Sequence, residues 1–298
     1  MQISGFSYIR NGFKYGYPFL QSIQSVLPIC DEFIIAVGDS EDGTKEAINN
    51  IGSSKIKIID TIWDEKLRNN GKIFAQQANI ALREIKGDWA FHIQADEVIH
   101  ENDLHKIYDH IKTANNENKI EGLLFDFLNF YGSYKYLNNT RYQHKKEIRI
   151  VRNNQNIYSY LDSQGFRKYP SYNDYVGDHK GDKLKVKYIN IPVYHYSYVR
   201  SPKQMNNKSK IFETFWHDDQ YIQNKYQQEQ EFNYYNIERI KLFNGTHPLV
   251  MKNIIEKEDW NFDPNKLNKQ LSIKDKILYF IEDKLNYRIG EYKNYKLI

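Results

Sequence analysis

The stretch Gly87-Asp88-Trp89-Ala90-Phe91-His92-Ile93-Gln94-Ala95-Asp96-Glu97 indicates most about the fold of this chain. Its apolar run, 89–93, predicts a buried strand, and two carboxylates, Asp96 and Glu97, follow at once. Open α/β sheets bind ligands beyond the carboxyl ends of their strands, and carboxylates there suit a divalent cation that carries a phosphate-bearing ligand. An acidic pair after a strand is more often a helix N-terminus, because it complements the helix dipole, and 101–111 has a helical pattern.

The chain before this stretch alternates predicted strands with predicted helices. The expected strands are 3–9, 33–37 and 56–59, and the expected helices are 17–27, 45–51 and 71–85. The loop 38–44, after the second strand, is rich in turn formers and N-cap residues. Such alternation predicts βαβ units around a mixed, mainly parallel sheet flanked by helices. The fold class is therefore α/β, of the Rossmann-like type that binds nucleotides.

Beyond residue 100 the pattern changes to longer strands followed by helices. We expect strands over 121–131, 147–152, 157–161 and 185–196, and helices over 101–111, 221–242 and 273–285. The returning strands would extend the sheet and build the far wall of a cleft. Nothing in the composition requires a second independent domain.

Length and composition favour a cytoplasmic enzyme. A chain of 298 residues can bury a substantial core, and its only cysteine, Cys30, fits a reducing compartment. The N-terminus lacks a signal-peptide pattern, and no apolar run approaches the roughly 20 residues of a membrane span. The 42 basic residues nearly balance 38 acidic ones, so we expect no nucleic-acid partner. The 25 tyrosines are compatible with stacking on sugar rings.

Several segments, taken in order, resemble the family-2-type glycosyltransferases with the GT-A fold, particularly a subgroup of small soluble bacterial-like members. The resemblance covers residues 1–215 and rests on segments 7–11, 37–44, 71–79, 87–97, 162–167 and 195–198. It implies a GT-A domain over 1–215, with a nucleotide-sugar half at 1–100 and an acceptor half at 101–215. Residues 216–298 would form a helical C-terminal extension.

The resemblance implies a metal-dependent, inverting transfer of a sugar from a UDP- or GDP-sugar to a hydroxyl of a glycan or lipid-linked glycan. Asp96 and Glu97 fall on the acidic metal motif of the family, with Asp96 as a ligand of Mn²⁺ or Mg²⁺ at the donor diphosphate. His195 falls where many such enzymes supply a second metal ligand. Taken alone, His195 is better explained as a histidine packed among neighbouring tyrosines.

The resemblance also implies a set of donor-binding residues. Asp39 and Asp42 follow the second strand, where family members recognise the base and ribose, although Asp42 is equally suited to capping the next helix. Lys72 and Gln76 begin the helix whose family counterpart approaches the pyrophosphate. A solvated lysine explains Lys72 nearly as well, and the same holds for Arg10.

Gln94 stands where many family members have an aspartate. Its amide can bind a ribose hydroxyl but adds no charge to a metal site, so a weakened enzyme or a carbohydrate-binding pseudoenzyme stays open. A sugar nucleotidyltransferase is less favoured, because the loop 10–14 is too poor in glycine.

The catalytic base of inverting family members is an acidic residue of the acceptor region. Asp162 is the candidate, and it would deprotonate the acceptor hydroxyl. It can equally be a turn residue before Ser163. Arg149 and Arg152 either hold an anionic ligand or pair with Glu147.

The last stretch, 273–298, clusters apolar residues on one helical face among lysines. This face would pack on the catalytic domain, pack on a second subunit in a homo-oligomer, or rest as a peripheral element on the inner face of an anionic membrane. Packing is the favoured interpretation.

Overall fold

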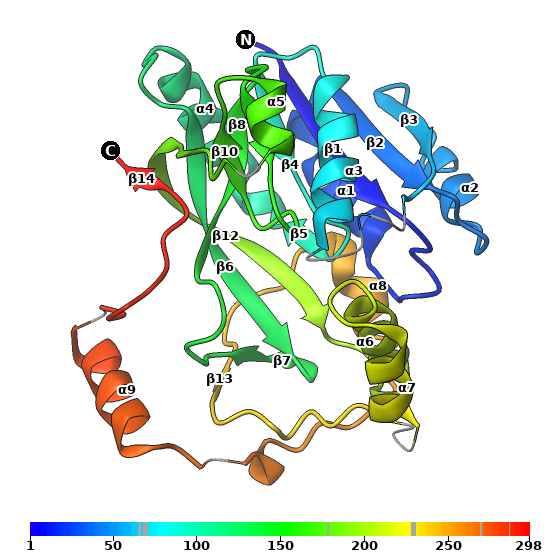
Figure 1. The fold of residues 1–298 in the computed structure, drawn as a ribbon, viewed down its shortest axis with the longest axis vertical. Coiled ribbons are helices and arrows are strands. Elements are labelled where there is room, and N and C mark those ends of the chain that lie inside the picture. The colour runs from blue at the N-terminus through cyan, green and yellow to red at the C-terminus, as the bar shows by residue number, and fades with distance from the viewer. Residues whose placement is uncertain (65–66, 68–70, 178, 228–230, 269, 286) are drawn as a thin grey trace.

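The computed structural model describes residues 1–64, 67, 71–177, 179–227, 231–268, 270–285 and 287–298. Within them the chain has an α/β fold, in which eleven strands pair into one curled, mixed sheet flanked by helices (Figure 1). The predicted fold class is confirmed.

Four parallel strands form the N-terminal part of the sheet, in the order β4-β1-β2-β3. Their bounds are β1 Ile3–Ile9, β2 Glu32–Gly38, β3 Ile56–Thr61 and β4 Trp89–His92. Residues on both faces of β1 and β2 are buried, and for this reason their sequences contain apolar runs instead of a clean alternation. The predicted strands in this region are confirmed.

Helices cover both faces of these strands. One face packs against α1 Phe19–Val26, α2 Thr44–Asn49 and α4 Leu104–Asn115, and the other packs against α3 Lys72–Arg83. Along β2, Phe33 and Ile35 belong to the first core, whereas Ile34 and Ala36 belong to the second. The alternation of a strand thus divides its apolar residues between two cores.

The second half of the sheet is built from longer strands. Their bounds are β5 Glu97–Ile99, β6 Gly122–Tyr131, β7 Ser133–Asn138, β8 Lys146–Arg152 and β12 Lys185–Tyr198. β8 lies between β4 and β6 and is antiparallel to both. β12 runs parallel to β6 and antiparallel to β5. These pairings bring the end of β12 next to the residues that follow β4.

A small second sheet and several short helices complete the first 227 residues. The strands are β9 Ile157–Ser159, β10 Phe166–Lys168 and β11 Asp182–Lys183, and the helices are α5 Tyr172–Val176, α6 Pro202–Glu213 and α7 Asp219–Tyr226. The loop between β9 and β10 and the helix α6 both reach the pocket described below.

Of the predicted helix over 221–242, the structure confirms the first part, 221–226, and the prediction is wrong for the later described residues; 228–230 lie outside them. α7 ends at Tyr226, and Ile240–Leu242 forms strand β13 on the edge of β7. Aromatic and aliphatic side chains between these elements pack into a cluster around Phe262 instead of lying on one helix face, among them Phe232, Tyr234, Tyr235 and Ile237. This packing favours an extended chain over a helix.

The rest of the C-terminal segment contains α8 Lys252–Ile255, α9 Ile273–Leu285 and strand β14 Lys296–Leu297. The predicted helix 273–285 is confirmed by α9. β14 pairs with the start of β12, so the segment runs along the edge of the molecule and rejoins the sheet (Figure 1). None of the helices in the described part of the chain has the length and apolar character needed to cross a membrane.

Candidate functional site

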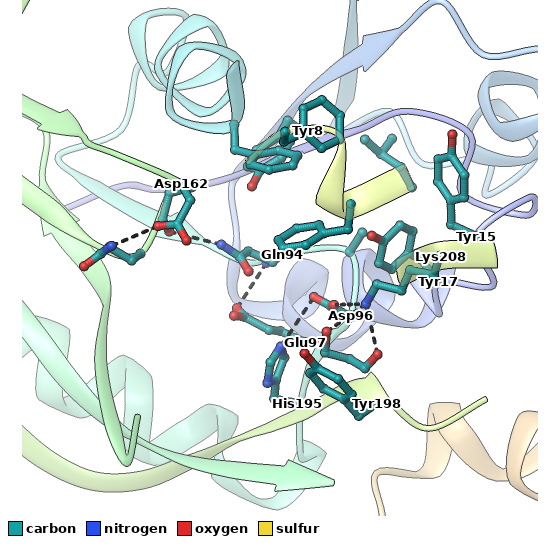
Figure 2. Close-up of a pocket in the computed structure, with 18 of the residues that line it drawn as sticks. Tyr8, Tyr15, Tyr17, Gln94, Asp96, Glu97, Asp162, His195, Tyr198 and Lys208 are labelled. Atoms are coloured by element: carbon teal, nitrogen blue, oxygen red, sulfur yellow. Dashed lines mark hydrogen bonds and ion pairs between the residues drawn. The ribbon is translucent and has the colours of Figure 1, made fainter. Parts of the chain in front are cut away.

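A pocket of about 510 Å³ lies beyond the carboxyl ends of β1 and β4 (Figure 2). Its floor comes from the segment after β4 and from the end of β12, and its walls come from the β9–β10 loop and α6. The predicted residues that line it are Arg10, Gln94, Asp96, Glu97, Asp162 and His195. This is the edge at which α/β sheets bind ligands.

The strand register explains how Asp96 and His195 meet. In the antiparallel pairing of β5 with β12, His195 lies opposite Glu97, and the backbone N–H of Tyr196 donates to the carbonyl of Asp96 at 2.8 Å. His195 Nε2 consequently lies 3.8 Å from Asp96 Oδ1, and both side chains are largely buried (Figure 2).

The protonation of His195 is fixed by a neighbour on β6. Asn129 donates its amide N–H to the carbonyl of His144 at 2.8 Å, which turns its amide oxygen toward His195 Nδ1 at 2.7 Å. Nδ1 therefore carries the proton, and burial lowers the pKa of His195, so the ring is neutral near pH 7. The lone pair of Nε2 faces Asp96, as in metal-ligating histidines oriented by a hydrogen bond to the other ring nitrogen.

The second oxygen of Asp96 faces a lysine that the sequence analysis missed. Lys208 Nζ, from α6, lies 3.6 Å from Asp96 Oδ2 and donates to the hydroxyl of Ser197 at 2.7 Å and to its carbonyl at 2.9 Å. Burial and the charge of Arg200 lower the pKa of Lys208 to about 7. Burial disfavours the charge of Asp96, but at the low pH where this carboxyl titrates His195 is protonated, and the charges of His195, Lys208 and Arg200 lower the pKa of Asp96 to about 2.

Glu97 occupies a different environment from its neighbour. Its side chain is fully buried, and its two oxygens accept hydrogen bonds from Arg149 at 2.8 and 2.6 Å. The backbone N–H of Gln94 donates to the same carboxylate at 3.1 Å. Glu97 was predicted to ligate a metal. In the structure its carboxylate lies in the protein interior and is already bound by Arg149.

The predicted base, Asp162, sits in a strained loop on the pocket wall. Leu161 and Ser163, on either side of it, have φ angles of 53° and 64°, in the left-handed region that side chains other than glycine rarely adopt. The side-chain amide of Gln94 donates to the carbonyl of Ser163 at 3.1 Å, which ties this loop to the pocket floor. Strained backbone of this kind concentrates at functional sites.

A second carboxylate that lines the pocket, Glu147, was not predicted as a site residue. It is buried, lines the pocket, and lies 3.7 Å from His144 Nδ1. Burial raises its pKa to about 8 despite the opposing charge of Arg149. The signal available in the sequence was its place on β8, two residues before Arg149, because residues two apart on a strand share a face.

Two predicted donor-binding residues, Asp39 and Asp42, do not line the pocket, whereas Arg10 does. Arg10 lines the pocket, lies over the ring of Trp63, and donates to the carboxylate of Asp39 at 3.0 Å. Asp42 instead accepts hydrogen bonds from the backbone N–H groups of Lys14, at 2.7 Å, and Thr44, at 3.2 Å. Asp42 thus organises the turn at the start of α2, and these hydrogen bonds lower its pKa although burial opposes them.

The structure does not bring the two predicted residues of α3 into the pocket. Lys72 is exposed and Gln76 is half-buried, and neither lines the pocket. Ile73 and Phe74 line it instead, because they face inward from the first turn of the helix. Phe74 contacts Phe212 of α6 in a stacked arrangement, so this wall is apolar.

Two side chains of the pocket, Asp96 and His195, have the chemistry of metal ligands and face one another. Among the residues that the structure describes, no group of three or more His, Cys, Asp or Glu side chains is arranged to hold a metal. A two-ligand set fits an ion that takes its remaining ligands from water and substrate phosphates, as Mg²⁺ usually does.

No protein-family model matches this chain, and no curated protein matches it in sequence. Among solved structures it is similar to TarS from S. aureus, with a TM-score of 0.41 and 16% identity over 71% of this chain and 39% of that one. TarS 1–349 in complex with UDP gives a TM-score of 0.41 and 14% identity over 72% of this chain and 65% of that one. Glucosyl-3-phosphoglycerate synthase from Mycobacterium tuberculosis, with Mg²⁺ and UDP, gives a TM-score of 0.29 and 16% identity over 44% and 43%. The chain spans less than two thirds of each of these structures.

Proposed function

We propose that this protein is a glycosyltransferase of the GT-A type, which moves a sugar from a nucleotide-sugar donor to a hydroxyl acceptor. The observation that carries the proposal is the facing pair of Asp96 and His195 in a pocket at the carboxyl edge of the sheet. A carboxylate and a neutral imidazole lone pair, held 3.8 Å apart, form an electron-rich site for a cation.

The cation of the proposed enzyme is Mn²⁺ or Mg²⁺, held by Asp96 and His195 but not by Glu97. When bound, such an ion offsets the charge that develops on the departing nucleoside diphosphate. Asn129 keeps the His195 lone pair available for the ion, and Arg149 keeps Glu97 out of the ligand set.

Asp162 is the proposed catalytic base. Its carboxylate accepts the proton of the acceptor hydroxyl while that oxygen attacks the anomeric carbon and the bond to the diphosphate breaks on the opposite face. The product then has inverted configuration. The strained backbone on both sides of Asp162 and its place on the pocket wall support this assignment. Glu147, which also lines the pocket, is the alternative candidate for the catalytic base.

The proposed donor is a UDP- or GDP-sugar whose base and ribose lie near Arg10 and Asp39. The ion pair of these residues and the ring of Trp63 offer hydrogen-bonding groups and an aromatic face at this end of the pocket. Gln94 remains a proposed contact of the donor, although its amide N–H already binds the β9–β10 loop. We leave Asp42, Lys72 and Gln76 out of the proposed donor site. The acceptor is a glycan or lipid-linked glycan.

The outward face of α9 supports a peripheral membrane contact, which we propose as part of this function. Its inner face is held by Glu282, which pairs with Arg141 at 2.8 Å and Arg288 at 3.0 Å. The outward face exposes Ile273 by 79%, Ile277 by 55% and Phe280 by 62%, flanked by Lys274, Lys276 and Lys284. Apolar side chains among lysines suit an anionic lipid surface, whereas self-association would bring the lysines of two copies together.

The proposed activity is tested by incubating the protein with a panel of nucleotide sugars and Mn²⁺ and measuring nucleoside diphosphate release. We expect release with one donor class and a loss of about 10²-fold or more in Asp96→Asn. Release of pyrophosphate would indicate a nucleotidyltransferase. Saturable binding without any product would indicate a carbohydrate-binding pseudoenzyme. Either result would overturn the proposal.

A further inference from the structure

Lys208 places a buried basic amino group inside the pocket. Its side chain is 7% exposed, and its ammonium group touches the pocket between Asp96 and the aromatic ring of Tyr17, 4.9 Å away. Two of its three N–H groups are used by Ser197. The third N–H has Asp96 Oδ2 as its nearest anionic partner, at 3.6 Å. Because this separation is long for a hydrogen bond, a ligand oxygen that enters beside Asp96 can accept from the same N–H.

The Asp96 carboxylate has basic neighbours on one side of the pocket floor. Arg149 pairs with the Glu97 carboxylate in the interior, whereas Asp96 faces Lys208 and Arg200. The further acidic residues that line the pocket are Asp64, Glu147, Asp162 and Glu213, so the basic character is local to the surroundings of Asp96. A phosphate placed beside Asp96 would meet the amino group of Lys208 in a site shielded from water, where such pairing is strong.

Arg200 is less available for a ligand than Lys208. Its guanidinium donates to the backbone carbonyls of Tyr15, at 2.7 Å, and Tyr196, at 3.3 Å, and it also bonds the carbonyl of Ser197. These bonds tie the end of β12 to the loop after β1. Lys208 lines the pocket, and Arg200 acts behind it.

We propose that Lys208 binds the diphosphate of the donor directly, so that this protein holds a nucleoside diphosphate without a divalent ion. The inference rests on the proposed function and deepens it: the metal adds to diphosphate binding but is not required for it. The two oxygens of Asp96 then have different partners. Oδ1 faces His195, beside which the metal would bind, and Oδ2 faces Lys208.

The test is calorimetric titration of the full chain with UDP and with GDP, first in excess EDTA and then in Mn²⁺. Lys208→Met removes the ammonium but keeps much of the side-chain volume, and Lys210→Met, at an exposed position of the same helix, is the matched control. We expect the wild type and Lys210→Met to bind one of the nucleotides in EDTA. Lys208→Met should bind it about 10- to 100-fold more weakly there, the loss of a charged hydrogen bond. A melting curve of each variant shows whether it is folded, and Lys208→Arg, which restores the charge, should recover part of the affinity.

Each result distinguishes the inference from the function on which it rests. Wild-type binding that needs Mn²⁺, or equal binding by Lys208→Met and the wild type in EDTA, would overturn the inference and leave the proposed function standing. A wild type that binds neither nucleotide under either condition would contradict the proposed function itself.

Discussion

Arg149 donates to both carboxylate oxygens of Glu97, and the two side chains are 3% and 0% exposed. Because of this ion pair, the two adjacent carboxylates of the sequence, Asp96 and Glu97, have different surroundings. Glu97 is neutralised in the interior, and Asp96 faces the pocket beside His195 and Lys208. The chemistry of the site therefore depends on Asp96.

The buried ion pair of Arg149 and Glu97 should contribute strongly to the free energy of unfolding. Arg149→Met leaves the Glu97 carboxylate buried without its partner, so we expect the free energy of unfolding to fall by about 3–5 kcal/mol. Lys57→Met, which breaks the exposed ion pair with Glu84, is the control and should cost less than about 1 kcal/mol. Urea denaturation at pH 7 measures both. Equal losses in the two variants would show that the buried pair has no special role.

We expect Asn129 to support metal binding, because its side chain orients His195. Asn129→Leu removes the oxygen that accepts from His195 Nδ1, so the ring can rotate or protonate at Nε2. We expect a 10- to 100-fold loss of Mn²⁺ affinity, measured by the decrease of the free Mn²⁺ signal in electron paramagnetic resonance. His105→Ala, at an exposed position on α4, should bind as the wild type does. Unchanged affinity in Asn129→Leu would exclude His195 as a ligand.

Glu147 makes a pH-dependent prediction. Burial raises its pKa to about 8 in the folded state, above the ordinary value of 4.5, so between these values the folded protein binds more protons than the unfolded chain. The contribution of this group is fully present below about pH 4.5 and is lost as the pH rises through about 8. Urea denaturation at pH 5.5 and pH 8.5 should therefore show a smaller decrease for Glu147→Gln than for the wild type. An identical decrease in both proteins would contradict this assignment.

Kinetic measurements distinguish Asp162 from Glu147 as the catalytic base. If Asp162 is the base, Asp162→Asn should lower kcat by about 10²–10⁴-fold and leave the affinity for the nucleoside diphosphate unchanged. Glu147→Gln should keep a larger share of kcat. Steady-state rates and calorimetric titration of both variants decide the matter. The opposite order of the two losses would assign the base to Glu147.

The outward face of α9 makes a prediction about membranes. Co-sedimentation with vesicles of phosphatidylglycerol should retain the wild type and release Phe280→Ser, because exposed apolar area and positive charge act together. Vesicles of phosphatidylcholine are the charge control and should retain less of the wild type. Retention on neither lipid, or a concentration-dependent dimer that Phe280→Ser dissolves, would assign this face to protein packing.

The periodicity of the sequence predicts most of the fold because buried strands and helices have strong patterns. The strands 3–9 and 185–196 and the helix 273–285 agree with β1, β12 and α9. The helix predicted over 221–242 ends early, at Tyr226, because the aromatic residues that follow pack on a partner distant in sequence, Phe262, which a local pattern does not reveal.

The site was less predictable than the fold. The resemblance linked Asp96 to His195, and the register of β5 with β12 provides the physical reason why they are adjacent. Lys208 was missed because a lysine on a helix that also carries exposed lysines is usually solvated. Its spacing from the buried Met205, three residues earlier, places it on the inward face of α6. The engagement of Glu97 by Arg149 joins β5 and β8, two strands that do not pair with one another and lie close only in the folded sheet, so a local sequence pattern does not reveal it.

The most direct test of the account is a crystal structure of the protein with UDP or GDP and Mn²⁺, with anomalous scattering recorded at the manganese edge. We predict one anomalous peak within bonding distance of Asp96 and His195, and a diphosphate that contacts both this ion and Lys208. A peak on Glu97, or a nucleotide bound away from Asp96, would contradict it.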